Sequence, residues 1–333
     1  MSVMAFITRA VCIVALVVPL FWYSVSREPG CSENLQLDRL TALFGNVECT
    51  IRIERRGNWW EAHGEDGAYQ ASIYYPDGKS SNSRTTSQVI IRIPGGPGDA
   101  TNRVWESQYP YTAWLMNAAD RCDVPIINLA YTGTRPNYSE EKPLIDNAIK
   151  DIEQLILNAD KSYGRENVII IAESLGSYLA LLSSVPMKGR RILLVNPLIR
   201  SPKDWRSRRD GAVSVVRAKV PVRLMRAQDA RWVTEFRNSE QMFNEFFDKA
   251  AEEYDRDLLQ LAAREGSYSG LVIYDPNDRL RTKAAKDKLE AVGFRVVGIS
   301  PLDHSLASNP FSLKVAFAHM DKFIDESCGA GLS

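Results

Sequence analysis

The chain has 333 residues, of which 45% are hydrophobic and 25% charged, a composition that allows a sizeable core and excludes wholesale disorder. Lysine plus arginine and aspartate plus glutamate both number 41, so the net charge gives no support to nucleic-acid binding. The length suits one large domain with an inserted subdomain, or two small domains.

The N-terminal segment is the part of the chain that does not have a globular pattern. Residues 10–25 are almost wholly apolar, with Arg9 before them and Arg27 after them. As a helix, such a segment spans roughly 24 Å, less than the ~30 Å hydrocarbon core of a bilayer. We therefore predict that residues 1–26 form a signal peptide or, as the alternative, an uncleaved anchor that contacts the membrane through residues 10–25. Both interpretations predict export, either to a periplasmic or secreted location or to a membrane-anchored one.

Four cysteines lie beyond this segment, at Cys31, Cys49, Cys122 and Cys328. An even count in an exported protein permits two disulfides, and the sequence does not choose among the three pairings. Four free thiols are the alternative. The cysteines do not have metal-ligand spacing. The motifs of the chain imply no metal, nucleotide or other cofactor.

Strand-like runs and helical periods alternate along the rest of the chain. The predicted strands are residues 47–53, 69–75, 88–93, 125–130, 167–172, 191–195, 270–274 and 294–299. Helical patterns occupy residues 143–163, the stretch that begins at Ser174, and residues 283–292 and 311–324. This alternation predicts the α/β class, with a mostly parallel sheet flanked by helices.

One segment interrupts the alternation. Residues 199–269 contain no strand-like run, and their aromatic and charged residues suggest a mostly helical insertion. We therefore predict a core formed by residues 27–198 and 270–333, and a helical cap formed by residues 199–269.

The five residues Ala172-Glu173-Ser174-Leu175-Gly176 follow a predicted strand directly and open a predicted helix. Small residues two positions before and after the serine allow a tight turn, and the serine stands at the positive end of the helix. The sequence thus presents Ser174 as a candidate nucleophile. A serine that only caps the helix is the alternative interpretation.

Three further signals follow the ends of predicted strands. The first is the glycine-rich loop Pro94-Gly95-Gly96-Pro97-Gly98, whose bare main-chain N–H groups can point at a developing oxyanion, although an ordinary tight turn has the same composition. The others are the loops that carry Asp275 and Asp278, and then His304. Since the ends of parallel strands meet at one edge of a sheet, we expect these groups to gather there. His304 is the predicted base, because His63 falls in an early polar loop and His319 in the terminal helix.

The order of donor loop, serine, aspartate and histidine resembles that of the α/β-hydrolase superfamily. The Gly-Gly-Pro-Gly run resembles the His-Gly-Gly-Pro-Gly loop of prolyl aminopeptidase-like serine hydrolases, with Pro94 in place of the histidine. The resemblance implies a catalytic triad of Ser174, Asp278 and His304. It also implies oxyanion donors at the Gly96 and Leu175 amides, with Gly95 and Gly98 supporting the loop.

The function expected from these residues is hydrolysis of an ester or amide through an acyl-enzyme, on a small-molecule or peptide substrate. An aminopeptidase-like peptidase is one interpretation, and a carboxylesterase or lipase is another. Two further alternatives are a membrane-tethered acyltransferase and a hydrolase-like binding protein without turnover. The sequence does not specify the substrate or the oligomeric state.

Overall fold

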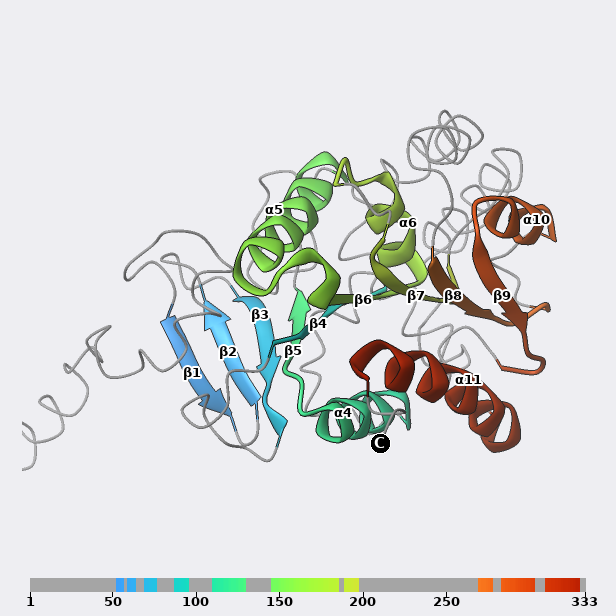
Figure 1. The fold of residues 1–333 in the computed structure, drawn as a ribbon, viewed down its shortest axis with the longest axis horizontal. Helices are drawn as coiled ribbons and strands as arrows, with labels where there is room; N and C mark the ends of the chain where they lie inside the picture. Colours follow the sequence, from blue (N-terminus) through green and yellow to red (C-terminus); the bar gives the residue numbers. More distant parts are fainter. Residues whose placement is uncertain are drawn as a thin grey trace, which may run out of the picture.

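The computed structural model describes residues 52–56, 59–63, 69–76, 87–95, 110–129, 145–185, 189–197, 269–277, 283–302 and 309–329. Its strands form one nine-stranded sheet in the order β1-β2-β3-β5-β4-β6-β7-β8-β9 (Figure 1). The strands are β1 (Arg52–Arg56), β2 (Trp59–His63), β3 (Tyr69–Tyr74), β4 (Val89–Ile93), β5 (Ile126–Leu129), β6 (Val168–Glu173), β7 (Arg191–Val195), β8 (Ser269–Tyr274) and β9 (Phe294–Gly298). The α-helices are α4 (Pro110–Cys122), α5 (Ile145–Tyr163), α6 (Ser174–Leu182), α10 (Lys283–Ala291) and α11 (Pro310–Cys328).

The sheet is parallel from β5 to β9 and antiparallel at its other end. Strands β4, β5, β6, β7, β8 and β9 all pair in parallel, whereas β1, β2 and β3 pair antiparallel and β3 joins the parallel part through β5. The prediction of an α/β fold with a mostly parallel sheet is therefore confirmed. We call the edge at which the parallel strands end the carboxyl edge.

Two of the nine described strands correct or extend the sequence prediction. His63 ends strand β2 and pairs with Arg52 of β1, so its placement in a polar loop was wrong. The first predicted strand, residues 47–53, overlaps β1 only at its end, because β1 covers Arg52–Arg56 and residues 47–51 lie outside the described ranges. Strands β1 and β2 form an antiparallel hairpin in which polar and apolar residues do not alternate regularly, so the sequence pattern does not reveal the strands. The pairing between the two strands defines them.

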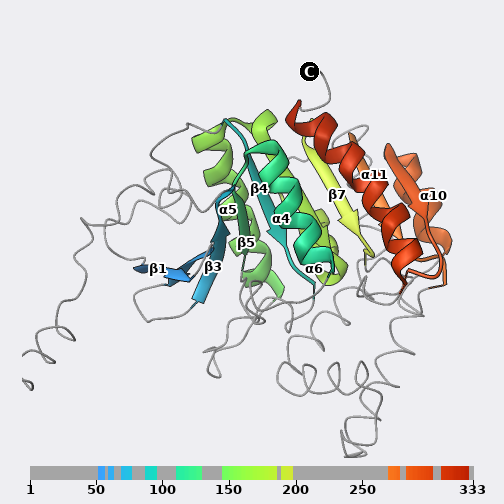
Figure 2. The ribbon, with the colours of Figure 1, turned by 90° about the horizontal axis from the view of Figure 1, so that it is seen from below.

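Side chains of the parallel strands point alternately to two hydrophobic layers. Ile91 of β4 and Ile170 of β6 pack on the side that α5, α6 and α10 cover. Ile90 and Ile169 pack on the opposite side, beneath α4 and α11, and Figure 2 shows the sheet from this second side. Because both faces are covered, β4 and β6 read as nearly continuous runs of buried β-branched residues.

The connections place a topological switch point between β4 and β6. The chain leaves β4, returns through α4 to β5 on one side of β4, and then crosses through α5 to β6 on the other side. Helices α4 and α5 consequently lie on opposite faces of the sheet (Figure 1). In open parallel sheets such a point leaves a crevice at the carboxyl edge, where ligands bind.

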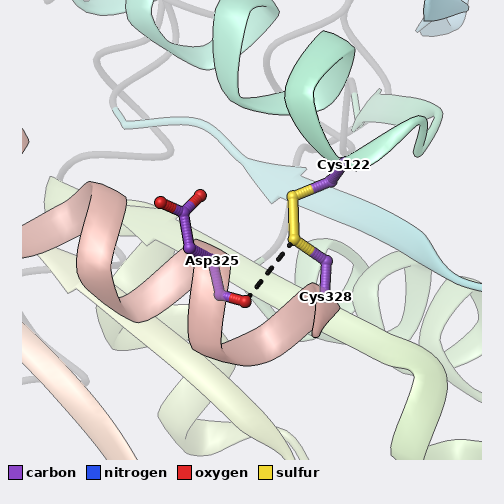
Figure 3. Close-up of side chains that lie close together, drawn as sticks. All are labelled: Cys122, Asp325 and Cys328. Atoms are coloured by element: carbon purple, nitrogen blue, oxygen red, sulfur yellow. Dashed lines mark hydrogen bonds between the residues drawn. A yellow bond between two sulfur atoms is a disulfide. The ribbon is translucent and has the colours of Figure 1, made fainter. Parts of the chain in front are cut away.

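A disulfide ties together the two helices that cover the second face. Cys122 ends α4, Cys328 ends α11, and their sulfur atoms are bonded with the Cα atoms 5.8 Å apart (Figure 3). Nearby, Arg121 Nη2 donates to Asp321 Oδ1 at 2.6 Å, and Trp114 Nε1 donates to the same oxygen at 2.8 Å. The structure thus selects Cys122–Cys328 from the pairings that the sequence left open, while Cys31 and Cys49 lie outside the described residues.

We expect loss of this disulfide to destabilise the fold strongly. The bond closes a loop across a sequence separation of 206 residues, and in the chain-entropy model such a closure contributes about 5 kcal/mol, of which real bonds deliver about 2–4 kcal/mol. Urea unfolding of the variant with Cys122→Ser and Cys328→Ser should show a loss in that range. A variant as stable as the oxidised wild type would contradict the bond.

The predicted N-terminal segment and the predicted cap are not part of the described structure. Residues 1–26 and 199–268 lie outside the described ranges, so both assignments stay predictions. Ser269, the last residue of the predicted cap, is instead the first residue of β8. Among the helices that the structure does describe, none has the length and apolar character needed to cross a membrane.

Candidate active site

The turn between β6 and α6 presents Ser174 at the carboxyl edge. Glu173 ends the strand in extended conformation, with φ −120° and ψ 140°, and α6 begins at the next residue. Ser174 itself has a φ of 45°, in the left-handed region. Within the described part of the chain, the other non-glycine residues with positive φ are Asp123 and Asn196, types that tolerate this region well. A serine there costs on the order of 1–3 kcal/mol, a strain that is typical of functional sites.

Close packing of α6 against the end of β4 requires glycine at position 176. A Cβ on Gly176 would lie 2.3 Å from the Pro94 carbonyl oxygen and 2.5 Å from that of Ile93. Ser177 fixes the same turn from inside, since its buried hydroxyl donates to the Ala172 carbonyl at 2.7 Å. The small residue that the sequence places two positions after the serine is therefore needed for contact with a neighbouring strand.

We predict that Gly176→Ala reverses the usual benefit of alanine in a helix. Alanine normally stabilises a helix by about 1 kcal/mol relative to glycine, but here the methyl group meets backbone atoms, and overpacking costs about 1–3 kcal/mol. Thermal unfolding should show the loss, and turnover should fall because the turn carrying Ser174 is displaced. Gly189→Ala is the comparison. Gly189 has positive φ, so alanine is strained there, but its Cβ would meet no atom within 4 Å, and turnover should be unchanged. Unchanged turnover in Gly176→Ala would contradict this account.

The glycine-rich loop begins beside this turn. Gly95 is buried directly after β4, and the Pro94 carbonyl that precedes it is the one that Gly176 approaches. Leu175 is the second residue of α6, where backbone amides have no partner within the helix, and its side chain is buried. Ser174, Leu175 and Gly95 are thus brought to one place, while Gly96 and Gly98 lie outside the described residues.

A buried carboxylate ties the neighbouring loops of the carboxyl edge together. Asp275, the first residue after β8, is 4% exposed and accepts from the Asn277 amide at 2.8 Å and from the Leu302 amide at 2.9 Å. Its own amide donates to Asn196 Oδ1 at 3.0 Å, at the end of β7. The Asn277 side chain also donates to Ser300 Oγ at 2.7 Å. The loops after β7, β8 and β9 are therefore held side by side.

Asp278 and His304 lie outside the described residues, so the predicted triad is not tested as a set. The structure does describe Asn277, one residue before Asp278, and Leu302, two residues before His304. The backbone amides of both donate to Asp275. Since β8 and β9 are parallel neighbours, the two loops start from adjacent points of the carboxyl edge. Asp278 as orienting acid and His304 as base stay predictions.

Solved structures identify the fold. Similar ones include DcsB complexed with its substrate analogue (TM-score 0.53, 12% identity, 84% of this chain and 99% of that chain). Another is Est1E from Butyrivibrio proteoclasticus with bound ferulic acid (TM-score 0.51, 12% identity, 79% of this chain and 97% of that chain). The chain has the α/β-hydrolase fold. No protein-family model matches the sequence, and no curated protein matches it significantly. These likenesses show the fold alone, so the closer resemblance to prolyl aminopeptidase-like enzymes stays a prediction.

Behind the turn that carries Ser174 lies an ion pair that the sequence alone did not identify. Arg92 of β4 donates from Nε and Nη2 to the two carboxylate oxygens of Glu173, at 2.6 and 2.7 Å. Its Nη1 donates to Asn128 Oδ1 of β5 at 2.8 Å. The signal was present in the sequence, since Arg92 and Asn128 interrupt otherwise apolar strands, and a buried charge requires a partner.

Tyr111 of α4 completes this cluster. Its ring lies against the Arg92 guanidinium, whose central carbon is 5.7 Å from the ring centroid. Burial raises the pKa of the Tyr111 hydroxyl well above its usual value, the Glu173 charge raises it further, and the Arg92 charge opposes the rise. The hydroxyl therefore remains protonated at neutral pH.

The described residues contain one group with enough close ligand atoms to consider for a metal, formed by Cys122, Asp325 and Cys328. Figure 3 shows that its two sulfur atoms are bonded to each other. Metals bind the thiolate form of cysteine, so this oxidised pair is not a suitable ligand set.

Proposed function

We propose that the protein is a serine hydrolase that cleaves an ester or amide bond through an acyl-enzyme at Ser174. The observation that carries the proposal is the left-handed φ of 45° at Ser174, on a strand-to-helix turn at the topological switch point of an α/β-hydrolase sheet. A strained turn of this kind raises the serine Oγ clear of the sheet, where a substrate carbonyl can approach it. A capping serine does not require the strain, because cap residues have ordinary extended backbone.

In the proposed mechanism, the Ser174 Oγ attacks the substrate carbonyl carbon while His304 takes the hydroxyl proton. Asp278 orients the imidazole, and the oxyanion accepts hydrogen bonds from the Gly96 and Leu175 amides. Collapse of the tetrahedral intermediate expels the alcohol or amine, which receives the proton from His304. Water, deprotonated by His304, then attacks the acyl-enzyme and releases the acid and the free serine.

The helical cap and export belong to the same proposal. We propose that residues 199–268 cover the carboxyl edge and select the substrate, because the chain leaves β7 at that edge before it returns to the start of β8. Export is supported by the Cys122–Cys328 disulfide, since such bonds persist mainly in oxidising compartments.

A fluorophosphonate probe tests the proposed chemistry directly. It should label the protein, and peptide mapping by mass spectrometry should place the label on Ser174. Amino-acid amides and short acyl esters, assayed in parallel, should then separate a peptidase from an esterase. A folded protein that is neither labelled nor active on either substrate class would contradict the proposal and favour a binding protein.

A further inference from the structure

The ion pair between Arg92 and Glu173 has a well-defined geometry close to the carboxyl edge. The guanidinium and carboxylate meet as a fork with both bonds at 2.6–2.7 Å, and their side chains are 7% and 12% exposed. Two parallel bonds fix orientation as well as distance, which a single contact between point charges does not. The pair therefore holds the end of β6 in one position relative to β4.

The sheet register explains why these residues meet. Arg92 lies opposite Asn128 of β5 and opposite Ile171 of β6. Glu173 is two residues beyond Ile171, so it projects from the same face, one step nearer the carboxyl edge. One guanidinium thus connects the three strands β5, β4 and β6, and Tyr111 of α4 covers it.

Stability alone is a weak reason for this arrangement. Removing two charges from water carries a large desolvation penalty, and well-packed apolar residues at such positions are often as stabilising or more so. Glu173, however, is bonded through its peptide group to Ser174, whose backbone is strained. Strain of this kind persists only where the surroundings over-determine the conformation.

We propose that Arg92 and Glu173 are positioning residues that hold the nucleophile turn in its strained conformation and so aim Ser174. Asn128 orients the guanidinium from the other side, and Tyr111 excludes water from the pair. The inference rests on the proposed serine chemistry, and it adds a second layer of residues behind the nucleophile. Misplacement of a reacting group by about 1 Å can reduce the rate on the order of a hundredfold.

The chain offers a matched control at the opposite edge of the sheet. Arg190, just before β7, forms a two-bonded pair with Asp160 near the end of α5, and its side chain is 1% exposed. Residues just before a parallel strand lie at the amino edge, away from Ser174. Arg190→Met therefore removes a guanidinium that is buried even more deeply than that of Arg92, without touching the nucleophile turn.

The experiment compares the fluorophosphonate labelling rate and the kcat and KM of wild type, Arg92→Met, Arg190→Met and the double variant with Arg92→Met and Glu173→Leu. We expect Arg92→Met to lower the labelling rate and kcat by about a hundredfold with KM little changed, whereas Arg190→Met lowers stability but not kcat. The double variant buries no unpaired charge but leaves the Asn128 amide oxygen without its donor, so it should fold with a loss of about 1–3 kcal/mol and still label slowly.

Equal labelling rates in Arg92→Met and Arg190→Met, or full recovery of labelling in the double variant, would overturn the inference and leave the pair a purely structural feature. If Arg92→Met does not fold, the double variant alone decides between these outcomes. Failure of the wild type to label would instead refute the proposed serine chemistry, and the positioning role with it.

Discussion

Replacing Ser174 with alanine is expected to lower kcat on the order of a millionfold, the size of effect known for nucleophile removal in a serine protease. Alanine removes only the Oγ and keeps the Cβ, so the turn has the same backbone strain and the fold should be retained. Fluorophosphonate labelling should disappear together with turnover. Initial-rate kinetics on an activated ester and circular dichroism are the two measurements.

Ser183→Ala is the matched control for that prediction. Ser183 stands directly after the same helix, at its other end, where its buried hydroxyl oxygen accepts from the Val185 amide at 3.1 Å. Its loss should cost about 1 kcal/mol of stability and leave turnover intact. Activity that survives in Ser174→Ala would assign the nucleophile elsewhere.

The parallel core was predictable because the amino-acid composition of its strands is itself typical of buried strands. Strands β4, β6 and β7 are short, largely apolar runs, rich in β-branched residues in β4 and β6, and they are followed by Pro94, Ser174 and Asn196. The helix after Ser174 was predictable for the same local reason, since its apolar residues continue directly from the strand. Local patterns of this kind do not depend on which strands become neighbours.

The antiparallel hairpin and helix α4 were harder to predict because their signals are weak locally. Strands β1 and β2 mix charged and aromatic residues, and they are defined by pairing with each other and with β3. Helix α4 reads as PYTAWLMNAADRC, in which a buried stripe that includes Trp114 and Leu115 is diluted by polar residues. Packing against α11, rather than a strong helical pattern in its own sequence, stabilises this helix.

The partners of the candidate site residues required the strand order. Arg92 and Glu173 are 81 positions apart in sequence, and only the adjacency of β4 and β6 brings them together. Asp275 likewise meets Leu302 because β8 and β9 are neighbours and their loops leave the sheet side by side. The sequence could offer Ser174 as a candidate nucleophile from one local motif, but not the residues that pack behind its turn.

The choice between Asp275 and Asp278 as the orienting acid yields the second large predicted effect. Both oxygens of the Asp275 carboxylate already accept backbone amides, from Asn277 and from Leu302, inside the protein. A carboxylate used in this way maintains the loop geometry, and we predict that Asp278, rather than Asp275, orients His304. Asp278 follows Asn277 directly, beyond the turn that Asp275 stabilises, and the α/β-hydrolase resemblance places the acid there.

We therefore expect Asp278→Asn to reduce kcat on the order of ten-thousandfold with little loss of stability, because an amide no longer holds the imidazole tautomer that accepts the serine proton. Asp275→Asn should instead lower the stability and leave kcat nearly unchanged. Its amide group would face a backbone N–H that has lost its acceptor, which costs about 1–3 kcal/mol of unfolding free energy, while the folded fraction keeps most of its turnover. Urea unfolding and kcat, measured for both variants on one ester, separate the two roles. A ten-thousandfold loss in Asp275→Asn, with Asp278→Asn close to wild type, would exchange the assignments and make the buried carboxylate the acid of the triad.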